Sequence, residues 1–115
     1  MTPAELEKAA LALPGAELSI KWGDDRRYVV AGKMFAATDG ASTNLSMKMT
    51  DIAFETLTET ARARPAPYMA RAKWVMFNDV SGLDATEVEG WLKTAHELVA
   101  AKLPKKQRAS LGLGV

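Results

Sequence analysis

Cations and aromatic rings are concentrated in one thirteen-residue stretch, RARPAPYMARAKW, which runs from Arg62 to Trp74. Four cations stand there beside Tyr68 and Trp74, without a single acid. Lysine and arginine bind phosphate oxygens, and an exposed ring such as that of Tyr68 can stack on a nucleic-acid base. These residue types therefore indicate the binding of a polyanion.

A second basic cluster follows near the end of the chain. Residues 1–61 hold six Lys/Arg against nine Asp/Glu, whereas residues 62–115 hold nine against five. Clustered cations create a local positive field even on a protein whose net charge is only +1. They also occur as solvated faces that only keep a protein soluble. Both interpretations stay open for the second cluster, which consists of Lys102, Lys105, Lys106 and Arg108.

Catalytic and metal-binding patterns are absent from the sequence. The chain has no cysteine, and its one histidine, His96, has no second histidine with which to bind a metal. His96 falls at the edge of an apolar helix stripe, so we expect a packed ring with one nitrogen in water; a general base is the alternative. Asp24 and Asp25 are typical turn residues. We therefore expect a non-enzymatic protein with no catalytic residue, metal or cofactor; an enzyme acting on a small anion stays open.

The elements that must position the cations can be predicted from capping and periodicity. Thr2 and Glu5 form a capping box that begins a first helix, which ends at Pro14-Gly15. Alternating segments joined by short turns then predict antiparallel strands, one hairpin turning at Gly32-Lys33. A helix follows over TDIAFETLTETAR and a strand over KWVMFN. A last helix, capped by Asp84 and Glu87, ends at Pro104.

This order predicts an α+β fold, a two-layer domain in which helices cover an antiparallel sheet in the order α-β-β-β(-β)-α-β-α. A length of 115 residues suits one domain, which we place at residues 1–109, with 110–115 as a flexible C-terminal tail. No apolar run is long enough to span a membrane. The lack of cysteine and of a signal peptide favours a cytoplasmic location for the protein. We expect it to be a monomer or a homodimer.

Several motifs resemble those of the MmcQ/YjbR-like family of small bacterial domains, and they occur in the same order and with the same spacing. The resemblance covers about Pro3 to Arg108 and implies a two-layer fold similar to that of secretion chaperones. Members are commonly labelled DNA-binding, and many carry a histidine where Tyr68 stands here. The matching motifs are Trp22-Gly23, Gly32-Lys33, Pro65 to Tyr68 and Lys102 to Lys106.

The function expected from these observations is DNA binding through phosphate contacts with little sequence preference. The alternative is a protein-interaction or chaperone-like module, using the open face of the sheet or the methionine-rich strand with Met47 and Met49. Tyr68 is the candidate stacking residue. The predicted phosphate contacts come from Lys33, Arg64, Arg71, Lys73, Lys102, Lys105, Lys106 and Arg108.

Overall fold

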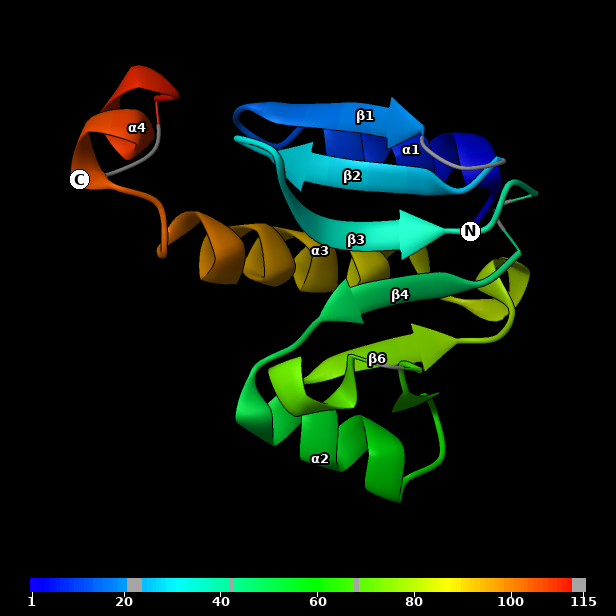
Figure 1. Ribbon diagram of the computed structural model, residues 1–115. Helices are drawn as coiled ribbons and strands as arrows, with labels where there is room; N and C mark the ends of the chain where they lie inside the picture. The colour runs from blue at the N-terminus through cyan, green and yellow to red at the C-terminus, as the bar shows by residue number, and fades with distance from the viewer. Residues whose placement is uncertain (21–23, 42, 68, 113–115) are drawn as a thin grey trace.

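A computed structural model describes residues 1–20, 24–41, 43–67 and 69–112 (Figure 1). The chain forms one helix, four consecutive strands and then a mixture of helices and short strands, which confirms the predicted α+β fold. The elements are α1 (Pro3–Leu11), β1 (Ala16–Ile20), β2 (Arg26–Val30), β3 (Lys33–Thr38), β4 (Leu45–Lys48), α2 (Asp51–Glu59), β5 (Arg64–Pro65), η1 (Ala70–Ala72), β6 (Trp74–Phe77), η2 (Val80–Gly82), α3 (Ala85–Ala100) and α4 (Lys105–Ser110).

The strands form one antiparallel sheet in the order β1-β2-β3-β4-β6-β5. Helices α1 and α3 lie behind this sheet in Figure 1, and α2 lies beside β6 at the lower end. The front of β2, β3 and β4 has no described helix over it. The two-layer arrangement is therefore confirmed, with one covered and one open sheet face.

The main core lies between the sheet and helices α1 and α3. Tyr28, Ala36, Met47 and Val75 are neighbours across four strands, and all four are fully buried. Burial of such side chains is worth roughly 1.5–3 kcal/mol for each large apolar residue. The helices contribute the opposing residues Leu6, Ala10, Val88, Leu92 and Ala95.

The methionine-rich strand was one of two contact surfaces expected for the alternative function, and the burial of its methionines excludes it. Met47, on the side of β4 that faces the helices, is 0% exposed, and Met49, just after β4, is 2% exposed. The strand alternation was predicted correctly, but the sequence alone did not show which face the helices cover. Neither methionine is available to a partner.

The proline-rich stretch folds back over the open sheet face. Ala66, Trp74 and Met76 form a second, smaller cluster, against which Met34 and Met69 pack. Trp74 is 4% exposed and therefore packed within this cluster. Its buried ring is therefore not a platform for stacking bases.

His96 is buried rather than placed at a boundary as the helix angle predicted. Its side chain is 3% exposed, and its Nε2 lies 2.7 Å from the carbonyl oxygen of Pro14. Its ring meets that of Phe35 edge-on, with 5.4 Å between centroids. The turn after α1 covers this edge of α3. Helical periodicity cannot predict such a tertiary contact.

Helix α4 was not predicted. Its N-cap, Pro104, has no side chain that can cap it, so the sequence lacks a start signal. Leu111, in the predicted flexible tail, packs against the main core. A Cβ atom added at Gly15, whose φ is +70°, would lie 3.3 Å from the Leu111 side chain. The described part of the tail is therefore anchored at Leu111.

Candidate anion-binding site

The β2–β3 hairpin positions the first cation of the site. Its turn residues, Ala31 and Gly32, have φ of 50° and 77°, the conformation that a tight two-residue hairpin requires. The turn therefore lies one residue earlier than the predicted Gly32-Lys33. Lys33 is the first residue of β3, and it is exposed.

A space opens beside Lys33 because β3 and β4 are paired over only part of their length. β3 begins at Lys33, but its pairing with β4 covers only Ala36 to Thr38. A register shift between β2 and β3 also lies at Tyr28/Val29, and bulges of this kind bend a strand. In Figure 1 the start of β3 curves away from the end of β4.

A hollow of about 460 Å³ lies at this end of the sheet. Its walls come from the starts of β3 and β6, the ends of β4, η1 and α3, and the segment that follows α3. We call it the lysine hollow. Its described lining consists of Lys33, Met34, Lys48, Ala72, Trp74, Val99, Lys102 and Leu103.

Three lysines from separate elements meet in this lining. None of the described lining residues is acidic. The Nζ of Lys48 donates a hydrogen bond to the carbonyl oxygen of Ala72 at 2.7 Å, which fixes one cation at the wall. Lys33 and Lys102 are exposed, so their ammonium groups can adjust to a bound group.

The surroundings of Lys48 disfavour its protonated form. Burial lowers the pKa of Lys48, and the charge of Lys102 lowers it further. Asp51 acts in the opposite direction, with a smaller effect than that of Lys102. A bound anion would stabilise the protonated ammonium of Lys48, because an opposite charge within a few ångströms favours the charged form.

The predicted C-terminal cations lie at the same end of the molecule. Helix α4 begins two residues after Leu103, and Figure 1 places it beyond the end of α3. Lys105 and Lys106 are exposed in its first turn. Arg108 is half-buried, and its Nε is buried without a hydrogen-bond partner among the described residues.

The cations of the proline-rich stretch are dispersed instead of gathered. Arg71 is exposed and precedes Ala72 in the chain, but it is not among the described lining residues of the hollow. Lys73 lies over the ring of Phe54 on α2, with its Nζ 5.0 Å from the centroid. Arg64 is exposed on β5, at the opposite edge of the sheet from β1.

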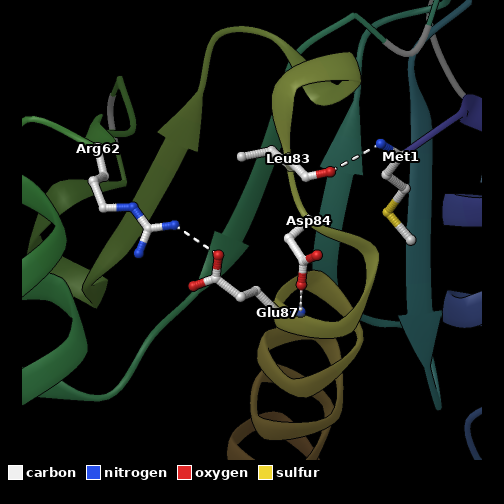
Figure 2. Close-up of polar contacts among 5 residues, drawn as sticks. All are labelled: Met1, Arg62, Leu83, Asp84 and Glu87. Carbon is white, nitrogen blue, oxygen red and sulfur yellow. Dashed lines mark hydrogen bonds and ion pairs between the residues drawn. The ribbon is translucent and has the colours of Figure 1, made fainter.

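Arg62 is neutralised. Its guanidinium donates to the carboxylate of Glu87 at 2.9 Å (Figure 2). The guanidinium also lies over the ring of Trp91, 5.5 Å from the centroid. Figure 2 also shows the Asp84 side chain accepting from the Glu87 backbone N–H, which is half of the predicted capping box. The other half would be a hydrogen bond from the Asp84 backbone N–H to the Glu87 side chain. The Glu87 carboxylate pairs with Arg62 instead. The thirteen-residue stretch is therefore not one continuous positive surface.

Of the predicted residues, Lys33 and Lys102 meet in the hollow, whereas Tyr68 lies outside the described residues. Lys48 was missed. The strand pattern placed it on the side away from Met47, but only the pairing of β4 with β6 shows that it stands opposite Trp74 at the rim. The alternating pattern continues to Met49, so the sequence carried no signal that Lys48 is the last residue of its strand.

No three described His, Asp or Glu side chains are grouped so that they could hold a metal ion. None of the described helices has the length and hydropathy of a membrane span.

The fold and the hollow define a class: a two-layer α+β domain with a cation-lined hollow at one end of its sheet. The YjbR family model matches residues 11–98, and the chain belongs to this family. A crystal structure of the Deinococcus radiodurans protein DR2400, which contains the DUF419 domain, is similar, with a TM-score of 0.85 and 22% sequence identity. The likeness covers 98% of this chain and 89% of the other and establishes the fold. No curated protein matches the sequence.

Proposed function

We propose that the protein binds nucleic acid through backbone phosphates, with little sequence preference. One observation carries the proposal: Lys33, Lys48 and Lys102 come from three elements to one hollow whose described lining holds no carboxylate. Neutralising phosphates with lysine releases condensed counterions, which supplies most of the affinity of binding without sequence preference.

The exposed cations around the hollow extend this site. Lys105 and Lys106 lie just beyond Lys102 along the chain, and Arg71 precedes the lining residue Ala72 in the chain. Phosphate contacts position a nucleic acid but carry no sequence information, which is read from base edges. The outward face of α3 does not suit base reading, because its exposed residues alternate in charge: Glu89, Lys93 and Glu97.

The alternative function, a protein-interaction or chaperone-like module, stays a prediction, and its candidate contact surface is smaller than expected. Burial removes Met47 and Met49 from it, which leaves the open sheet face around Val29, Ala37 and Ser46. These three side chains are half-buried. We favour nucleic acid because the charges of the hollow suit phosphate, whereas this face has no comparable recognition feature.

The salt dependence of binding tests the proposal. Fluorescence anisotropy of a labelled 20-residue DNA strand and of its duplex is measured at several salt concentrations. If Lys33, Lys48, Lys102, Lys105 and Lys106 each neutralise one phosphate, the slope of log K against log salt is about −4.5 for duplex and about −3.5 for the single strand. A double variant, Lys102→Gln with Lys105→Gln, should flatten the duplex slope by about 2.

The matched control is Lys8→Gln with Lys93→Gln, which removes two exposed lysines from the surface between α1 and α3. It changes net charge equally and should leave the slope unchanged. If neither DNA binds at low salt, or if the control weakens binding as much as the test variant, the proposed function is wrong.

A further inference from the structure

The lysine hollow has more apolar wall than a phosphate group requires. Met34, Trp74, Val99 and Leu103 are four of its described lining residues. Met34 and Val99 are half-buried and therefore still offer surface to a ligand, whereas Trp74 and Leu103 are nearly covered. A volume of about 460 Å³ falls within the range of small-molecule sites, roughly 300–1,000 Å³. A phosphate alone would leave most of this space filled with water.

We propose that the lysine hollow takes one unpaired nucleotide, its base against Met34 and Val99 and its phosphate on Lys48 and Lys102. This inference rests on the proposed function and names its substrate class: single strands, gaps and ends of nucleic acid. A nucleotide combines a flat, weakly polar ring with an anionic group. That combination matches a hollow with apolar walls and cations on its rim.

Lys48 is the residue that links the two parts of the site. Its Nζ is held at the wall by the carbonyl oxygen of Ala72, and it stands opposite Trp74 in the sheet. The hydrogen bond uses one of the three ammonium protons, and two remain for phosphate oxygens. Lys102 lines the same hollow as Lys48, so the two cations face one space.

A paired base cannot enter the hollow without leaving the stack, which costs a few kcal/mol in an intact duplex. An unpaired base avoids the loss of a base pair. The affinity for a single strand should therefore exceed that for duplex, although the duplex has the higher charge density. Met34 adds tolerance, because a flexible and polarisable thioether adapts to any ring and does not select one base.

The first experiment compares DNA forms using the full chain. At one fixed salt concentration, a labelled mixed-sequence 20-residue strand should bind at least tenfold more tightly than its duplex. Met34→Ala should weaken single-strand binding about 2- to 12-fold, the range of a sulfur–aromatic contact. It should leave the duplex affinity and the salt slope unchanged, because no charge is removed. Leu11→Ala, which trims an exposed apolar side chain on α1, is the matched control and should change neither.

A second measurement does not depend on the folding of a variant. Adenosine monophosphate and inorganic phosphate are titrated separately into ¹⁵N-labelled wild-type protein. The nucleotide should shift the amide signals of Met34, Val99 and Lys102, whereas phosphate should shift only those near the lysines. If duplex and single strand bind equally, or if both titrants shift the same signals, the nucleotide site is wrong and phosphate binding stands. If no DNA binds, both proposals fail.

Discussion

The hydroxyl of Tyr28 provides the sharpest test of the core. Tyr28 is fully buried in β2, and its hydroxyl has no hydrogen-bond partner among the described residues. Glu7 and Arg26 lie near it and are paired with each other at 2.8 Å. Burial, with a further contribution from the negative charge of Glu7, raises the pKa of Tyr28 to about 12. We expect Tyr28→Phe to stabilise the protein.

Two magnitudes follow for this substitution. An unsatisfied buried polar group costs about 1–3 kcal/mol, so the free energy of unfolding at pH 7 should rise by about 1 kcal/mol or more. The second effect depends on pH. The unfolded tyrosine ionises near pH 10 and the folded one only near 12, so wild type keeps its full stability below pH 10. Between pH 10 and 12 this group lowers wild-type stability by up to about 3 kcal/mol.

Urea unfolding followed by circular dichroism, for both proteins at pH 7 and pH 11, measures both effects. The phenylalanine variant lacks the titrating group, so subtracting its pH dependence from that of wild type removes the contribution of all other groups. The free energy of unfolding of the variant minus that of wild type should increase by about 1.4 kcal/mol from pH 7 to pH 11. A variant less stable than wild type at pH 7, or an advantage that does not grow, would refute the reasoning.

Three further predictions concern two glycines and Lys48. Gly90→Ala should raise the free energy of unfolding by about 0.5–1 kcal/mol in urea unfolding, because a Cβ there meets nothing within 4 Å and alanine favours a helix. Gly40→Ala should lower it by about 1–3 kcal/mol in the same assay, because its Cβ would lie 2.5 Å from that of Asp24; an unchanged midpoint would contradict this contact. The lowered pKa of Lys48 predicts that DNA affinity falls with rising pH earlier than for an ordinary lysine. Anisotropy titrations of Lys48→Gln should lack this early decrease, and an identical pH profile would contradict it.

Local signals predicted much of the fold. Thr2 accepts a hydrogen bond from the Glu5 backbone and Glu5 accepts from Thr2, as the capping box required. Asp84 begins α3 with half of such a box, because its side chain accepts a hydrogen bond from the Glu87 backbone N–H. Both signals lie within four residues of chain, where backbone groups have few other partners. The element order followed from such signals and from strand alternation.

The features that were missed depend on contacts between distant segments. His96 is buried by the turn at Pro14, 82 residues away in the chain. Lys48 reaches the hollow because the pairing of β3 with β4 ends early, which the composition of neither strand reveals. Arg62 is neutralised by Glu87, which lies 25 residues further along the chain in another element. Charge clusters in sequence therefore identified the right residue types but not which of them meet.

The last strand of the sheet, β5, is two residues long and contains Pro65. Proline has no backbone N–H, and a strand this short offers few groups to a neighbouring chain. This side of the molecule is thus a poor template for edge-to-edge aggregation. If copies of the protein assemble by adding strands to one another, the growing end must be β1.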